Sequence, residues 1–413
     1  MKPPIRVLHF ADVHVGMANF GKTDPQHGIS SRIVDFLARL DDMIDFAEAR
    51  EVDLVVFAGD AFRTRSPNPT IQREFAERVL RLSQLAPTLL LAGNHDLPLN
   101  AAKASSIEIF DTLALAGIWV AQDYETRRIG TRRGDIVLGA APYPMRARLL
   151  AHEDMRGLTI AEQDEALKLA LIEQLTALAQ QAQTLANDDA PKLLAGHFSL
   201  EGAMWGSERG VMLGRDVAVG LDCIADAGWD YVALGHIHQH QNLTHGQADW
   251  PPVVYSGSIE RIDFGEEGAA KGFCWVELRR GRADWQFVQL NARKLLTIEV
   301  DCRDSLDPTQ SVLAALEAQE LRDAVLRLHI ALTPESETLL NEGQIHRALR
   351  RSGLFHMAGL RKDIERSTRA RLGKSAEELS PLQLLARYFE SRDVDASRRD
   401  ELLTLAEDIM RRR

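Results

Sequence analysis

The stretch LLLAGNHD, residues 89–96, joins an apolar run of strand length to a glycine and three polar side chains. Glycine at position 93 permits a positive φ or a close approach of two backbones. The three polar residues that follow would be costly to bury without partners. Such a junction favours a core strand that ends at a functional loop.

The same pattern occurs four more times along the chain. The motifs are DVH at 12–14, GD at 59–60, GH at 196–197 and GHIH at 235–238, and each follows an apolar run of strand length. Taken alone, a short motif of this kind is more often an ordinary turn than a ligand site. Segments that follow parallel strands meet at the carboxyl edge of one sheet, where open α/β folds place their active sites. The ordered set therefore predicts one cleft assembled from distant parts of the chain.

The side chains in these motifs are typical metal ligands. The candidates are Asp12, His14, Asp60, Asn94, His197, His236 and His238. Carboxylate, amide and imidazole ligands without a thiolate suit manganese, iron or, less selectively, zinc, and the two carboxylates favour a harder cation. The set is too large for one tetrahedral site and suits two divalent ions that share a carboxylate. Because two such ions stabilise attacking and leaving oxygens in phosphoryl transfer, the predicted reaction is phosphoester hydrolysis.

The ordered motifs resemble those of the calcineurin-like metallophosphoesterases, and within them the bacterial SbcD-type nuclease subunits, counterparts of the Mre-type repair nucleases. The resemblance extends to YSGSIERIDFGEE at 255–267, which is similar to the family's Tyr-Pro-Gly-Ser segment and the Phe-x-Glu after it. It implies an α/β fold, a β-sandwich flanked by helices, as the dimetal nuclease domain over residues 1–292. A small α+β capping domain over 293–360 would follow, and then a linker and helical ATPase-binding segment over 361–413.

The resemblance also implies a role for each motif residue. Asp12, His14 and His238 would hold one ion, and Asn94, His197 and His236 the other, with Asp60 as the bridge. A metal-bound hydroxide would attack phosphorus, His95 would assist the leaving oxygen, and Asp96 would orient the His95 ring. Two residues depart from the family pattern, because Arg63 stands where relatives often have histidine and Ser256 replaces the proline of Tyr-Pro-Gly-Ser. The first change leaves open what this side chain does in choosing exonuclease over endonuclease action.

Composition limits the partners that the chain can use. The chain has a formal net charge of −11 over 413 residues. A protein that binds DNA tightly by itself is expected to carry an excess of positive charge, which this chain does not have. Arg63 and Arg65, close behind Asp60, are the candidate DNA contacts, and a partner would supply most of the affinity. The three scattered cysteines favour a reducing compartment, and neither a signal peptide nor a membrane span is expected. The predicted location is the cytoplasm, at nucleoid DNA.

The last segment predicts two amphipathic helices joined by a polar loop. Ser380 and Pro381 are typical of a helix start. In relatives such a hairpin binds the coiled-coil base of an SMC-like ATPase of the SbcC or Rad type, and the alternative is docking onto the chain's own domain. No Walker A sequence is present, so ATP hydrolysis would come from that partner. By resemblance, the nuclease would form a homodimer within a heterotetramer.

The prediction is therefore a manganese-dependent nuclease subunit that processes DNA ends in double-strand-break repair. By resemblance it would act as a 3′–5′ exonuclease on double strands and as an endonuclease on single strands and hairpins. One alternative is a phosphodiesterase or phosphatase for a small phosphoester, which the same two-ion centre could serve. Another is a structural subunit that mainly bridges DNA ends.

Overall fold

The computed structural model describes residues 3–25, 28–98, 100, 103–151, 158–186, 189–206, 216–365, 380–392 and 394–411. The chain divides into two compact units. One comprises residues 1–297, 320–327 and 350–359, and the other comprises residues 298–319, 328–349 and 360–413. Each is described by itself below.

Two six-stranded sheets form the centre of the first unit, within its described residues. One sheet has the order β14-β13-β1-β2-β3-β4, from β1 (Ile5–Phe10), β2 (Leu54–Phe57), β3 (Thr88–Leu91), β4 (Ile118–Ala121), β13 (Gly272–Arg279) and β14 (Arg282–Gln289). The other has the order β11-β12-β10-β7-β6-β5, from β5 (Glu125–Thr131), β6 (Gly134–Ala141), β7 (Lys192–His197), β10 (Tyr231–Gly235), β11 (Gln241–Asn242) and β12 (Val253–Tyr255). Strands β1 to β4 are parallel, as are β6, β7, β10 and β12, while the outer pairings are antiparallel.

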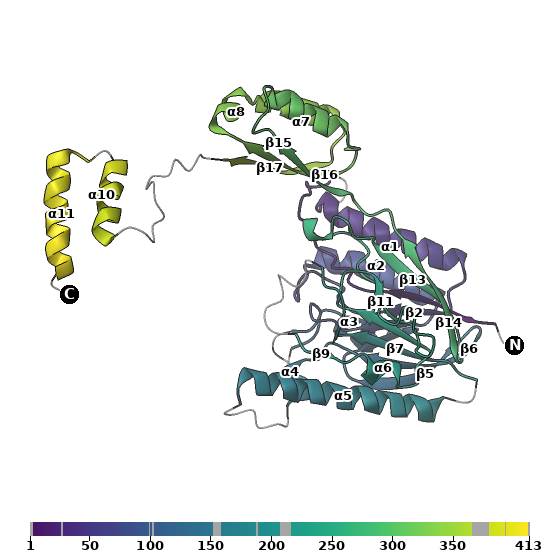
Figure 1. Ribbon diagram of the computed structural model, residues 1–413. Coiled ribbons are helices and arrows are strands. Elements are labelled where there is room, and N and C mark those ends of the chain that lie inside the picture. Colours follow the sequence, from purple (N-terminus) through teal and green to yellow (C-terminus); the bar gives the residue numbers. More distant parts are fainter. Residues whose placement is uncertain are drawn as a thin grey trace. The chain divides into compact units, whose positions relative to one another are not determined.

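The sheets pack face to face with helices on both outer sides (Figure 1). Val7, Val56 and Leu91 of the first sheet share a fully buried core with Leu138 and Ala233 of the second. Helices α1 (Ser31–Ala49) and α2 (Pro69–Leu85) cover the outer face of the first sheet. Helix α5 (Ile160–Leu185) covers that of the second sheet. The predicted β-sandwich flanked by helices is confirmed.

One part of the sequence argument is wrong. The ligand motifs do not follow the strands of a single sheet, because the first three follow β1, β2 and β3 while the last two follow β7 and β10 in the other sheet. The central strands of both sheets are buried on both faces, and such strands have the same apolar pattern whichever sheet they join. The motifs meet because the carboxyl ends of the two parallel regions lie at the same end of the sandwich.

The helix starts follow from local sequence. Asn68 accepts a hydrogen bond from the backbone N–H of Ile71, and Pro69 occupies the first turn of α2. Thr159 and Glu162 form a capping box at the start of α5. Shorter elements complete the unit: α3 (Glu108–Thr112), α4 (Arg146–Leu149), α6 (Asp222–Ala225), η2 (Phe264–Glu266), β8 (Ser199–Leu200) and β9 (Ala218–Val219).

Residues 293–365 contain a three-stranded sheet of order β15-β16-β17 and three helices, α7, α8 and α9. Their bounds are β15 (Leu295–Asp301), α7 (Pro308–Glu317), β16 (Val325–Leu332), α8 (Pro334–Leu339), α9 (Glu342–Arg351) and β17 (His356–Ile364). This stretch contains both strands and helices, as an α+β module requires. The proposed boundary between residues 360 and 361 falls inside β17, and the domain limits stay a proposal.

The C-terminal segment contains α10 (Pro381–Ser391) and α11 (Ala396–Arg411), as the sequence predicts. Ser380 and Gln383 form the capping box of α10. Large apolar side chains of the pair are exposed, among them Tyr388, Leu405 and Ile409. Most of the predicted linker, residues 366–379, lies outside the described residues. Among the described residues, none of the helices combines the length and the apolarity that a membrane crossing needs.

Candidate metal centre

The candidate ligands lie at the carboxyl ends of strands, most of them on tight loops and His197 as the last residue of β7. Asp12, His14, Asp60 and His236 all have positive φ angles, of 52°, 47°, 63° and 95°. A positive φ at a residue other than glycine costs roughly 1–3 kcal/mol, and residues in this conformation are concentrated at functional sites. Gly93 is required by packing, because a Cβ at this position would clash with the side chain and the backbone nitrogen of Asp60.

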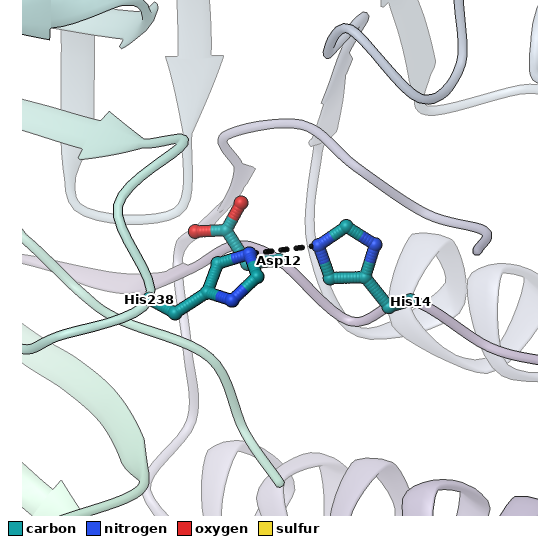
Figure 2. A group of neighbouring side chains, drawn as sticks. All are labelled: Asp12, His14 and His238. Atoms are coloured by element: carbon teal, nitrogen blue, oxygen red, sulfur yellow. Dashed lines mark hydrogen bonds between the residues drawn. The ribbon is translucent and has the colours of Figure 1, made fainter. Parts of the chain in front are cut away.

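Asp12, His14 and His238 form the first group of donors (Figure 2). The Nε2 atoms of His14 and His238 lie 3.0 Å apart, and all three residues are buried. The carboxylate of Asp12 accepts hydrogen bonds from the backbone N–H of His236, with distances of 3.0 and 3.1 Å. Burial lowers the pKa of His14 well below its ordinary value, so its ring is neutral and has a lone pair to donate.

Asn94, His197 and His236 form the second group. The Oδ1 atom of Asn94 lies 3.1 Å from Nε2 of His197 and 3.1 Å from Nδ1 of His236. The Nδ1–H of His197 donates to the carbonyl of Ala58 at 2.7 Å, which leaves Nε2 for the centre. The structure thus brings together all three residues assigned to the second ion.

Asp60 lies between the two groups. Its Oδ2 is 3.6 Å from Nε2 of His14, and its Oδ1 is 3.6 Å from Nε2 of His197. Burial raises the pKa of Asp60, but the neighbouring imidazoles, led by His197, outweigh burial and leave the pKa well below the ordinary value. One ionised carboxylate therefore presents one oxygen to each group.

This donor set fits divalent cations. Buried carboxylate, amide and imidazole donors converge from both sheets, and clusters of them have ligand atoms within 4.8 Å of one another. Burying so many lone pairs together is costly unless a cation or protons lie among them. Two divalent cations would satisfy these donors, and the assignment of each ligand to an ion stays a prediction.

His95 is positioned by a different residue from the one expected. Its Nδ1 lies 2.9 Å from the backbone carbonyl of Arg63, and since a carbonyl only accepts, Nδ1 carries the proton. The Asp96 carboxylate instead accepts from the backbone N–H groups of Gly93, Asp60 and Ala61, at 2.9–3.3 Å. The expected orienting contact between Asp96 and the His95 ring is therefore corrected. The side chains of His95 and Asp96 therefore contact different groups, and Asp96 fixes the backbone of the bridging residue, Asp60.

The environment of Asp96 supports this structural role. Its carboxylate is fully buried and also accepts from the hydroxyl of Ser106 at 3.2 Å. Burial and the nearby Asp60 carboxylate raise the pKa of Asp96 to about 7. Cations bound beside Asp60 would oppose this rise in the pKa of Asp96.

Sequence reasoning missed two carboxylates that contact ligand histidines. Asp216 Oδ2 lies 3.0 Å from Nε2 of His236, and Glu266 Oε1 lies 2.8 Å from Nδ1 of His238. Burial raises the pKa of Glu266, but the charge of buried Lys271 and the His238 contact lower it to about 2. The Phe-x-Glu resemblance included Glu266 without giving it a role, and no motif includes Asp216.

Arg63 and Arg65 lie on the exposed loop after Asp60. The Arg63 backbone contacts His95, and Nε of Arg65 donates to the carbonyl of Leu97 at 2.8 Å. The Arg63 backbone therefore adjoins the His95 ring and the Arg65 side chain holds the Leu97 backbone, while contact of either arginine with DNA stays a prediction.

The fold and the two groups of donors define a calcineurin-like phosphoesterase domain, and the family model of that description matches residues 5–240. The SbcD subunit of the SbcCD nuclease from Bacillus subtilis (strain 168) is 30% identical over 300 residues, which cover 71% of each chain. The SbcD protein of Escherichia coli (strain K12) is 30% identical over 288 residues, 68% of this chain and 66% of that one. DNA double-strand break repair protein Mre11 of Thermoplasma acidophilum is 22% identical over 320 residues, 76% and 73% of the two chains.

The chain belongs to the calcineurin-like phosphoesterase family and, within it, to the SbcD-type nuclease subunits. It is accordingly an enzyme of the dimetal phosphodiesterase class.

Proposed function

We propose that this chain is the nuclease subunit of a complex that processes DNA ends in double-strand-break repair, and that manganese is its metal. The observation that carries the proposal is the position of Asp60, whose two oxygens each lie 3.6 Å from a ligand histidine of a different group. A carboxylate shared in this way keeps two ions at the spacing that phosphodiester hydrolysis requires.

The metal ligands in this proposal are the seven residues expected from the sequence. Asp12, His14 and His238 hold one ion, Asn94, His197 and His236 hold the other, and Asp60 bridges. When bound, two divalent ions lower the pKa of water and neutralise charge on the phosphate. The oxygen and imidazole donors suit manganese.

His95 is the proposed catalytic side chain. The carbonyl of Arg63 holds the proton on its Nδ1, so Nε2 is the nitrogen that exchanges a proton with the leaving oxygen. The His95 ring lies edge-on to the His14 ring with centroids 4.9 Å apart, which places it beside the ligands. Asp96 holds the backbone around the bridging Asp60 and is a positioning residue.

The proposed substrate is DNA, as double-stranded ends for 3′–5′ exonuclease action and as single strands and hairpins for endonuclease action. The names of the relatives, which describe a nuclease of the SbcCD type and the double-strand break repair protein Mre11, support this class of substrate. Arg63 and Arg65 are the proposed phosphate contacts, because they are exposed on the loop that also orients His95.

The proposed partner is an SMC-like ATPase of the SbcC or Rad type. Helices α10 and α11 expose Tyr388, Leu405 and Ile409, and a helical pair of this size buries little apolar surface alone. The net charge of −11 also favours a partner that supplies DNA affinity. We further propose a homodimer of the nuclease subunit within a heterotetramer.

The test is digestion of an end-labelled linear duplex by the full chain in Mn²⁺, with and without the ATPase partner. Bis(p-nitrophenyl) phosphate is assayed in parallel as a small diester. Asp60→Ala and His95→Ala are compared with His245→Ala, which removes an exposed histidine outside the centre.

Loss of DNA digestion in the first two variants, with His245→Ala fully active, would support the nuclease function and the roles of bridge and proton donor. Cleavage of the small diester without DNA digestion, even with the partner present, would instead establish a small-molecule phosphodiesterase. If His95→Ala abolished cutting yet left DNA-end repair in cells intact, the chain would instead be a mainly structural subunit that bridges DNA ends.

A further inference from the structure

His236 and His238 turn opposite ring nitrogens toward the centre. His236 directs Nδ1 at Asn94, with 3.1 Å between Nδ1 and Oδ1. His238 directs Nε2 at His14, with 3.0 Å between the two Nε2 atoms. A neutral imidazole has its lone pair on only one nitrogen. These two residues of a single motif therefore serve as ligands only if they adopt opposite tautomers.

A carboxylate contacts the outward nitrogen of each ring. Asp216 Oδ2 is 3.0 Å from Nε2 of His236, and Glu266 Oε1 is 2.8 Å from Nδ1 of His238. The Asp216 side chain is 10% exposed and that of Glu266 is 2% exposed, so water competes little with either contact. An ionised carboxylate only accepts, so each contact places the ring proton on the outward nitrogen.

Each carboxylate is itself held in place by other donors. Asp216 accepts from the hydroxyl of Ser199 through the same Oδ2. Glu266 Oε2 lies 2.9 Å from the ammonium of Lys271, which is buried, and accepts from the backbone N–H of Ile262 at 2.8 Å. The groups that hold Asp216 and those that hold Glu266 come from different parts of the chain, so each carboxylate can be substituted without disturbing the other.

We propose that Asp216 and Glu266 are positioning residues that fix the opposite tautomers of His236 and His238, and that each controls the affinity of a different ion. The proposal rests on the ligand assignment under the proposed function. Loss of the partner of a ligand histidine typically costs 10–100-fold in metal affinity. Asp216 should therefore act on the ion held by His197, and Glu266 on the ion held by His14.

The test is calorimetric titration of Mn²⁺ into the metal-free full chain, which should show two binding steps. His197→Ala and His14→Ala identify which step belongs to which group. We expect Asp216→Asn to weaken the His197 step by about 10–100-fold and to leave the other step unchanged. We expect Glu266→Gln to weaken the His14 step by a similar factor.

Two matched variants serve as controls. Asp222→Asn removes an exposed carboxylate, and Glu267→Gln removes the carboxylate next to Glu266, which contacts Thr297 instead of a histidine. Both should keep the two steps at their original affinities.

Unchanged steps in both folded test variants, or weakening of the same step by both, would overturn the proposal. If Glu266→Gln does not fold because it leaves Lys271 buried and uncompensated, the double variant Glu266→Gln/Lys271→Gln replaces it, since it leaves no charge at either position. Uptake of fewer than two ions by the unmodified chain would refute the two-ion centre itself, which is a separate outcome.

Discussion

His9 makes the stability of the sandwich dependent on pH. The side chain is fully buried between the sheets, with Nδ1 3.1 Å from the Tyr231 hydroxyl and Nε2 3.2 Å from the Leu234 carbonyl. The carbonyl only accepts, so Nε2 carries the proton and Nδ1 accepts from Tyr231. Burial, the main cause, lowers the pKa of His9 from 6.5 to about 3. The folded chain therefore keeps this ring neutral under conditions where the unfolded chain protonates it.

The size of the effect follows from that difference in pKa. Between pH 6.5 and about 3 the unfolded chain binds one proton more at His9, so stability falls as pH falls through this window. At about pH 4.5, two pH units below the unfolded pKa, the loss is about 2.7 kcal/mol, since each unit is worth about 1.4 kcal/mol. His9→Gln cannot take up this proton. Its free energy of unfolding should fall by about 2.7 kcal/mol less than that of the parent chain between about pH 7.5 and 4.5.

Urea unfolding of the metal-free chain, followed by tryptophan fluorescence at both pH values, measures this difference. Other titrating groups are common to both chains and cancel in the comparison. His245→Gln, at an exposed histidine, should retain the pH dependence of the parent. If the free energies of unfolding of His9→Gln and the parent change in parallel with pH, the reasoning about His9 is wrong.

Three further outcomes concern the metal centre and its loop. Gly93→Ala should weaken Mn²⁺ binding at least about tenfold with unchanged circular dichroism, because the new Cβ displaces Asp60; unchanged calorimetry would contradict this. Mn²⁺ at about 100 times its Kd should add about 2.7 kcal/mol for each ion bound and raise the melting temperature by roughly 4 °C per ion. Asp60→Asn should lose most of that shift in a thermal melt. Arg63→Gln should weaken DNA binding and lower the slope of log affinity against log salt concentration by about 0.9, while cleavage of the small diester continues. Arg282→Gln, at a residue whose side chain is 71% exposed, should change neither DNA binding nor the slope.

The candidate ligands could be selected from the sequence because their signal is local, and the structure brings them together. Each apolar run is a buried strand, and each polar motif lies at or just beyond the carboxyl end of its strand, as LLLAGNHD at 89–96 illustrates. The assignment of strands to two sheets was not predictable in the same way. Residues of β1 and β10 are buried throughout apart from Arg6, so their patterns do not say which sheet each joins.

The misplaced role of Asp96 and the missed Asp216 have a common physical cause. The family resemblance implied that Asp96 contacts the His95 ring, but the turn directs the Asp96 carboxylate at the backbone of Asp60. Asp216 contacts His236 across twenty positions of sequence and belongs to no motif. Contacts of this kind depend on where loops fold in three dimensions, which no spacing rule encodes.

Hydrogen bonds that cross between the sheets organise the centre from protein groups alone. Asp12, after β1, accepts from the backbone of His236, after β10, and His197 of β7 donates to the carbonyl of Ala58, after β2. These contacts use the ligand residues but leave Nε2 of His197 and Nδ1 of His236 turned toward Asn94. The ions would therefore enter a site whose donors have already converged, and little binding energy would be spent on ordering loops. It follows that a substitution which separates the two sheets should weaken metal binding even where it touches no ligand.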